Sequence, residues 1–448
     1  MFGDATGPIS IIFYQKEQPP KPSDKIAYYA PKTFIKSNII DGLNIDFTDL
    51  KFLPRGECQK SDTKIWKIAM WGGMNDWELV NSLSKKFNKS IDAFLQENKG
   101  EYHFGSGLHS PSKKQIEENK TFSPNKVIDL RKVQRFYTLK SAEKPSQIVF
   151  RNINKNIFNP PYLIIKEGQK DKEFCASYID YVSYHTGAFS ISAIDDRHNI
   201  NLKLWCSLIN SSFAKYYLSL TSASWGIERE RVQSNETLTL PTLIKIDNKQ
   251  SNELEKKFDQ LINIIKSDFD FTKAKAVESE IDSIILDKIL QLSEQDKWTI
   301  ADLVDYSIDL FESQEKSKAL YPVLEEQISE YGKLISTELN DFLDGQDLIA
   351  NATLYNINRF TPLMMIKLSF AKKQKEVVTS KEFVDNELKK IDQHLWEEKS
   401  SNIYFRKKLN YKTGDDIYII RPNQRRFWSK SMALEDASEL ILEILSGN

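Results

Sequence analysis

The sequence predicts an α+β fold built from several domains. Its 448 residues suggest about three domains, at roughly 150 residues per domain. Hydrophobic residues make up 40% of the chain and charged residues 28%, which is an ordinary globular balance. Short apolar runs bounded by glycine and proline, typical of strands, alternate with longer segments whose apolar residues recur at helical spacing. Both kinds of element occur along the chain, which favours the α+β class.

The first half of the chain is expected to mix short strands with helices. Residues 9–14 and 26–30 are apolar, strand-like runs next to Gly-Pro and Pro-rich turns. Residues 76–87 carry apolar side chains at helical spacing and are predicted to form an amphipathic helix. The other predicted elements of this half are strands at 148–150 and 162–165, β-hairpin material at 178–192 and a buried helix at 202–218.

Helices dominate from about residue 248. Residues 251–266 and 274–292 have strongly periodic apolar faces, and Ser293-Glu294-Gln295-Asp296 resembles a capping box that opens a helix at 297–311. We favour a plain helical bundle over a heptad array for this part. The last hundred residues are predicted to combine strands at 353–355, 364–370 and 417–420 with helices, the last of them at 433–445.

Simple features exclude several classes of protein. The three cysteines lie far apart and the five histidines are scattered, so we expect no disulfide framework and no metal site. We also expect no cofactor. The apolar runs are far shorter than the roughly 18 residues of a membrane helix, and no signal peptide is visible, so we expect a cytoplasmic protein that does not bind membranes. The net charge of −1 gives no bulk argument for nucleic-acid binding, and only local clusters of basic residues could indicate it.

Two short motifs are typical of methyltransferases. Asn159-Pro160-Pro161-Tyr162 matches the catalytic loop of amino-group DNA methyltransferases, in which the aromatic ring stacks on a flipped base. Phe104-Gly105-Ser106-Gly107 resembles a glycine-rich loop for S-adenosylmethionine. Their context argues against this chemistry, because a cofactor loop follows a buried strand and opens a helix. Both flanks of the glycine motif are polar, and the Asn-Pro-Pro-Tyr stretch leads into a strand instead of ending one.

Longer stretches resemble the C-terminal, non-catalytic half of large bacterial N6-adenine DNA methylases of restriction–modification and phage-defence systems. The matching stretches are Trp66–Trp77, Phe158–Gly168, Leu208–Arg231 with the following Leu238–Pro241, and Asp416–Ala437. That half contains the target-recognition domain. The family's Rossmann-like catalytic half has no counterpart before residue 1, so the resemblance implies DNA recognition without methyl transfer by this chain.

The resemblance and the pattern together suggest four segments. We expect an N-terminal strand region (1–60), a target-recognition-like domain (61–247), a helical spacer (248–330) and a small C-terminal α+β domain (331–448). The expected function is that of a non-catalytic specificity subunit, which binds double-stranded DNA for a separate methyltransferase or effector. The alternatives are an interaction or scaffold subunit of a defence complex that binds no DNA, and, least favoured, an active N6-adenine DNA methyltransferase.

Three stretches are candidate DNA contacts. The loop after the predicted helix at 202–218 carries Trp225, Arg229 and Arg231, and arginine can bind guanine or phosphate through its planar fork. The alternative is a buried Trp225 with arginines that pair with Glu228 and Glu230.

The other two stretches combine basic and aromatic residues. Residues 421–430 contain four basic residues and no acid, with Phe427 and Trp428 between them, as in a surface that holds a phosphate backbone. The alternative is that both aromatic rings are buried. Residues 127–140 form a third, weaker candidate. The carboxylates of Glu278, Glu280 and Asp282 are predicted on a helix, which argues against a metal-dependent nuclease. The basic candidates are Arg421, Arg425, Arg426 and Lys430 in the second stretch, and Arg131, Lys132 and Arg135 in the third.

Overall fold

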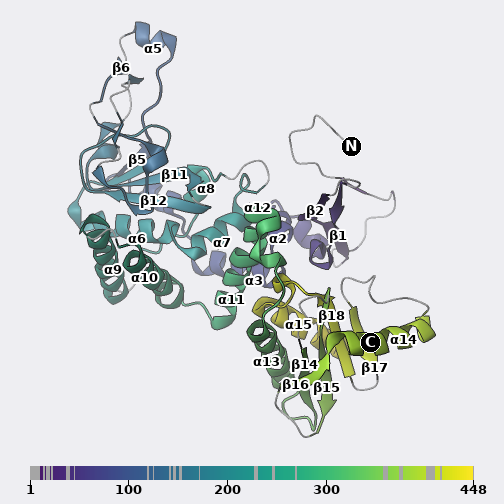
Figure 1. The fold of residues 1–448 in the computed structure, drawn as a ribbon. Helices are drawn as coiled ribbons and strands as arrows, with labels where there is room; N and C mark the ends of the chain where they lie inside the picture. Colours follow the sequence, from purple (N-terminus) through teal and green to yellow (C-terminus); the bar gives the residue numbers. More distant parts are fainter. Residues whose placement is uncertain are drawn as a thin grey trace. The chain divides into compact units, whose positions relative to one another are not determined.

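The structure is a computed structural model that confirms the α+β class. It describes residues 11–13, 16, 21, 24–36, 41–44, 46–118, 121–124, 126–140, 143–144, 148–150, 154–170, 172–226, 231–244, 248–267, 270–356, 362–372, 377–399, 409–413 and 416–446. The chain forms two compact units (Figure 1). Unit 1 contains residues 1–17 and 79–297, and unit 2 contains residues 18–78 and 298–448. Each unit thus joins segments that are distant in sequence, whereas the four predicted segments follow the chain in order.

Unit 1 is organised around a five-stranded sheet. Its order is β5-β13-β11-β12-β8, and every neighbouring pair is antiparallel except β12 and β8, which are parallel. The residues 178–192 therefore do not form a hairpin, as the sequence pattern predicted, because β12 and β13 pair with opposite edges of β11. The strands are β5 (Tyr102–Ser106), β8 (Phe136–Tyr137), β11 (Tyr162–Lys170), β12 (Glu173–Ile179) and β13 (Phe189–Ala193).

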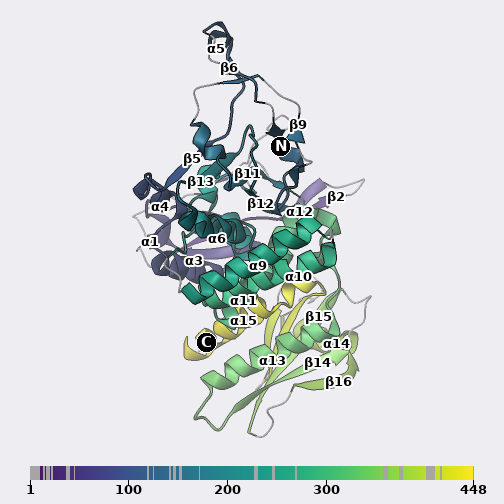
Figure 2. The same cartoon turned by 90° about the vertical axis from the view of Figure 1, so that its left-hand side faces the viewer.

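One face of this sheet is covered by helices. Helix α6 (Asn199–Ile209) packs on β12 and β13, and α9 (Asn248–Ser267) packs on α6 and beside α10 (Phe271–Ser283) (Figure 2). The predicted single helix at 202–218 is two helices, because Asn210 and Ser211 interrupt it. The Asn210 side chain bonds to both backbone groups of Ala176 in β12, at 3.1 Å from its nitrogen and 2.8 Å from its oxygen. The Ser211 hydroxyl then caps α7 (Ser212–Thr221).

The opposite face of the sheet is covered by a layer of irregular chain. Buried residues from 108 to 158 pack there against Tyr162 and Ile164 of β11 and Cys175 and Ile179 of β12. This layer includes two short strand pairs, and the part that carries α5 and β6 projects away from the sheet (Figure 1). Its elements are α5 (Lys113–Glu117), β6 (Thr121–Phe122) with β10 (Val149–Phe150), and β7 (Val127–Ile128) with β9 (Glu143–Lys144).

Unit 2 contains a second five-stranded sheet, in the order β16-β14-β15-β18-β17, with α13 packed against β14 and α15 (Figure 1). Residues 18–78 contribute two small two-stranded sheets and helix α2 to this unit. The sheet and its helices are α13 (Glu325–Phe342), β14 (Ile349–Asn356), β15 (Leu363–Ala371), β16 (Val378–Phe383), α14 (Val384–Lys399), β17 (Leu409–Thr413), β18 (Asp416–Pro422) and α15 (Lys430–Ser446). The N-terminal elements are β1 (Lys25–Tyr29) with β4 (Leu50–Pro54), β2 (Thr33–Lys36) with β3 (Asp41–Asn44), and α2 (Lys64–Trp71).

Most helices predicted from periodicity are present. The predicted helix at 76–87 is α3 (Met74–Lys86), and the capping box is formed, with Ser293 and Asp296 bonded reciprocally before α11 (Glu294–Asp302). Of the predicted strand at 9–14, residues 11–13 are described and form no strand, and the other three lie outside the described residues. Among the helices of the described residues, none is both long and apolar enough to cross a membrane.

Candidate nucleic-acid interface

The irregular layer of unit 1 is strongly basic. Residues 109–161 contain eleven lysines and arginines and four aspartates and glutamates, a net charge of +7 in a chain whose total is −1. The exposed basic side chains of the layer include Lys113, Lys114, Lys126, Arg131, Lys132 and Lys155. These six exposed residues belong to the layer that covers the face of the sheet opposite the helices. A localised basic surface of this kind is the electrostatic footprint of nucleic-acid binding.

The layer is held in place by backbone hydrogen bonds to the connection between β12 and β13. The Ile128 N–H donates to the Tyr184 oxygen at 2.7 Å, and the Tyr184 N–H donates to the Lys126 oxygen at 3.0 Å. On the other side of the connection, the Leu108 N–H donates to the His185 oxygen at 2.9 Å. Lys126 therefore stands on backbone that is bonded to this connection, as in binding loops presented by a rigid scaffold.

Arg131 and Lys132 lie in a short turn on the outer side of this layer. Both are exposed, and the Arg131 guanidinium is bonded to the Asp129 carboxylate, with Nη2 at 3.0 Å from Oδ2. Asp129 itself is nearly buried and also accepts the Arg131 backbone N–H at 3.0 Å. The side chains of Arg131 and Lys132 are therefore accessible to a ligand.

Arg135 has a different environment. Its guanidinium donates to the Asn210 carbonyl, which ends α6, and lies 3.5 Å from Glu278 of α10. A cation at this position stabilises the C-terminal end of a helix. Arg135 thus joins the sheet to α6 and α10, and we remove it from the DNA surface.

The loop that carries Trp225 is fixed from within. Trp225 is fully buried, as in the alternative that the sequence left open. The Glu236 carboxylate accepts hydrogen bonds from the N–H groups of Ala223 at 2.8 Å and Ser224 at 3.1 Å, and also from the Ser224 hydroxyl. Burial would raise the pKa of Glu236, but these hydrogen bonds outweigh it and lower the pKa. Trp225 is therefore an anchor of the fold and not an exposed stacking surface.

The two arginines of this loop are placed differently. Arg229 lies outside the described residues. Arg231 is exposed and paired with Glu167 of β11, whereas Glu228 and Glu230, its partners in the alternative, lie outside the described residues. Arg231 remains accessible to a phosphate, which would have to displace Glu167 from the ion pair.

The C-terminal basic stretch is largely internal to unit 2, which corrects its interpretation as a DNA surface. Arg421 is fully buried and forms an ion pair with Asp436 of α15, and it donates to the Phe427 oxygen at 3.1 Å. Phe427 and Trp428 are also fully buried. Arg421 therefore cannot contact a phosphate in this structure, and the alternative of buried aromatic rings is correct.

The remaining basic residues of this stretch also have partners within unit 2. The Arg426 side chain is almost buried, lies 3.1 Å from Asp46 and stacks on the Phe427 ring. Arg425 donates to the Pro322 oxygen at 3.3 Å, and Lys430 lies 3.3 Å from Glu330. Only Arg425 and Lys430 of this stretch keep substantial contact with solvent.

Both methyltransferase-like motifs lie in closely packed parts of unit 1. The Tyr162 ring is fully buried beside Phe158, and its hydroxyl donates to the Ser183 oxygen at 3.1 Å, so the ring has no free face for a base. Gly107 lies against His185, where a Cβ would come within 2.5 Å of the imidazole. Close packing of the layer therefore accounts for this glycine without a cofactor.

The carboxylates of α10 are engaged in structural contacts. Asp282 accepts the Ser212 N–H at 2.8 Å at the start of α7, and Glu278 faces Arg135. Burial raises the pKa of both carboxyl groups. No group of three or more potential metal ligands occurs in the part of the chain that the structure describes.

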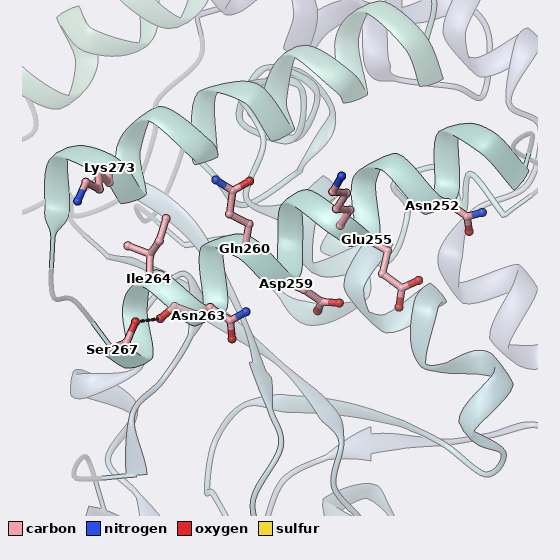
Figure 3. Close-up of a pocket in the computed structure, with 9 residues that line it drawn as sticks. Asn252, Glu255, Asp259, Gln260, Asn263, Ile264, Ser267 and Lys273 are labelled. Carbon is pink, nitrogen blue, oxygen red and sulfur yellow. Dashed lines mark hydrogen bonds between the residues drawn. The ribbon is translucent and has the colours of Figure 1, made fainter.

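A shallow groove of about 870 Å³ runs along α9 toward the start of α10 (Figure 3). Its lining residues are mostly polar, and its two carboxylates, Glu255 and Asp259, both pair with Lys203 at 2.8 Å. Ligand pockets are enclosed and mostly apolar. This groove has the chemistry of a solvated helix face.

No family model and no curated protein matches the chain. Among solved structures, the chain is similar to the Type IIL restriction-modification enzyme MmeI in complex with DNA, with 11% identity and a TM-score of 0.28. The match covers 47% of this chain and spans 35% of the length of that enzyme.

The sequence interpretation missed the extent of the basic layer. It considered only residues 127–140, whereas the excess positive charge extends over residues 109–161. A running charge sum over a longer window would have found it. It also missed Asp129 as the partner of Arg131, although the two residues are only two positions apart.

Proposed function

We propose that this chain is a DNA-binding specificity subunit of a restriction–modification or phage-defence system, which recognises target DNA for a separate methylase or effector. The observation that carries the proposal is the basic character of the layer on one face of the unit 1 sheet: residues 109–161 have a net charge of +7, and the six lysines and arginines named above are exposed in the structure. The sequence resemblance to the recognition half of adenine methylases, which covers β11 and α7, agrees with it. The chain itself is proposed to be non-catalytic, since the Tyr162 ring is packed in the core.

Binding to duplex DNA with a random sequence tests the proposal directly. We expect binding that weakens steeply between about 50 and 200 mM salt, because lysines that contact phosphates displace counterions. Substitution of Lys126 and Lys132 by alanine should flatten the log–log salt slope by about 0.9 for each phosphate that the variant no longer neutralises. The matched control is the Lys99→Ala/Arg197→Ala variant, which removes the same charge from exposed residues beside α4 (Ile91–Glu97) and α6.

The results separate this proposal from its main alternative. Equal salt slopes for the two double variants would remove the basic layer from the DNA surface. If the unmodified chain shows no salt-dependent DNA binding, alone or with a candidate methylase, the interaction or scaffold role is the remaining proposal. The polar, solvated face of α9 is then the next surface to test.

A further inference from the structure

Arg131 is exposed, but its orientation is fixed by a buried carboxylate. The guanidinium donates from Nε to Asp129 Oδ1 at 3.2 Å and from Nη2 to Oδ2 at 3.0 Å. The Arg131 side chain is 84% exposed, whereas that of Asp129 is 5% exposed. An arginine on a surface usually samples many rotamers. The Asp129 carboxylate instead holds the Arg131 guanidinium in one orientation at the surface of the basic layer.

The hydrogen bonds to Asp129 occupy the Nε and Nη2 edge of the Arg131 guanidinium and leave its Nη1 and Nη2 edge available to a ligand. Nε and Nη2 form the side-on pair, and both donate to the Asp129 carboxylate. The end-on pair, Nη1 and Nη2, keeps N–H groups for a second planar acceptor. Guanine presents O6 and N7 side by side in the major groove, which matches such a pair.

We propose that Arg131 reads a guanine in the major groove and that Asp129 is its positioning residue. This inference rests on the proposed function and names a base that the site recognises. The charge favours a base over a phosphate, because the Asp129 carboxylate neutralises the arginine and repels a phosphate anion. Guanine is uncharged, so this neutralisation does not weaken its attraction to the guanidinium. The exposed lysines beside it, Lys126 and Lys132, are suited to the phosphates.

The turn is rigid enough to position a base contact. The Lys132 N–H donates to the Asp129 oxygen at 2.8 Å, and the adjacent Val133 is fully buried. Ile128, on the other side, is bonded to Tyr184. Because the fork is already oriented before binding, less side-chain entropy is lost when it meets the base.

The chain contains a matched control for this arrangement. Asp195-Asp196-Arg197 forms the same kind of turn, with Arg197 Nε at 3.0 Å from Asp195 Oδ2 and the Arg197 side chain 80% exposed. This turn precedes α6 and lies outside residues 109–161 in the sequence, and its Asp195 is 43% exposed. Substitution of Arg197 therefore removes the same chemistry at a position outside residues 109–161.

The first experiment selects bound sequences from a randomised duplex library with the unmodified chain, Arg131→Ala and Arg197→Ala. We expect a guanine at one position to be selected by the unmodified chain and by Arg197→Ala, and to be lost only in Arg131→Ala. At that position the preference for guanine should fall by about 5-fold to 150-fold. Asp129→Asn should also weaken this preference, while binding to random DNA becomes stronger because a negative charge is removed.

The second experiment replaces the selected guanine by 7-deaza-2′-deoxyguanosine, which lacks the N7 acceptor. The replacement should weaken binding of the unmodified chain and have no further effect on Arg131→Ala, as in a double-mutant cycle for one contact. Additive effects, or full base preference in a folded Arg131→Ala variant, would overturn this inference and leave DNA binding intact. Absence of any DNA binding by the unmodified chain would instead overturn the proposed function, and the inference with it.

Discussion

The buried ion pair of unit 2 gives a quantitative test of the placement of Arg421. Replacing Asp436 by alanine leaves the guanidinium without its counter-charge in a site with no solvent contact. Breaking one partner of a buried pair costs about 3–5 kcal/mol. The same substitution removes the acceptor of the Tyr331 hydroxyl, which costs about 1–3 kcal/mol for a buried donor. We therefore expect at least about 3 kcal/mol of destabilisation, confined to unit 2.

Hydrogen exchange of peptides from β18 and α15 is the suitable assay, because a chain with two units has no single free energy of unfolding. Arg421→Met/Asp436→Leu is the control, since removal of both charges is close to neutral and only the loss of the Tyr331 acceptor, about 1–3 kcal/mol, remains. Arg425→Ala, at the surface, should change stability by less than about 1 kcal/mol. If Asp436→Ala exchanged like the double variant, the guanidinium would not be held by this carboxylate. Altered salt dependence of DNA binding in the folded double variant would return Arg421 to the DNA surface.

Three further predictions concern titratable groups and one loop. Burial, with Asp76 nearby, raises the pKa of Glu435 from 4.5 to about 7, so the folded chain holds a proton that the unfolded chain releases. The stability of unit 2 should fall as the pH rises through this window, and Glu435→Gln should recover up to about 3 kcal/mol at a pH of about 8, measured by hydrogen exchange of α15. Burial lowers the pKa of His185 from 6.5 to about 3, so unit 1 should lose stability as the pH falls below 6.5. Hydrogen exchange of β11 and β13 peptides, compared between the unmodified chain and His185→Gln, measures this loss of stability. Equal pH dependence of stability in the two proteins would contradict the prediction. Glu236→Ala should destabilise the Trp225 loop by about 2 kcal/mol, seen as faster exchange of residues 222–226, with Glu255→Ala on the solvated face of α9 as the unaffected control.

Local patterns predicted the local elements well. The helix at 76–87, the helices from 251 onward and the strands at 364–370 and 417–420 all exist within a few residues of the expected bounds. Their apolar residues repeat at the spacing of one secondary structure, which is information contained in the segment itself. The split between α6 and α7 was missed because Asn210 ends the helix through bonds to β12, a partner that lies 34 positions earlier.

The features that the sequence did not predict depend on contacts between residues far apart in the chain. Arg421 looks like a surface cation in its own segment, but Asp436 and Phe47 enclose it from two other elements. The pairing of β12 and β13 with β11 similarly depends on a chain crossing that no pattern in residues 178–192 contains. The DNA contacts of Arg131, Lys132 and Arg231 stay predictions, and the structure adds which of them are accessible.

The make-up of unit 2 has a consequence for synthesis of the protein. Asp46 pairs with Arg426, which follows it by 380 residues, and the Phe47 ring packs on Phe427. At roughly 5–20 residues per second, the N-terminal segment waits about 20 to 80 s on the ribosome for its partners. All of residues 79–297 emerge during that time and can fold first. A chain that stops before residue 298 leaves Phe47 and its neighbours permanently uncovered, so incomplete translation products should aggregate or be degraded.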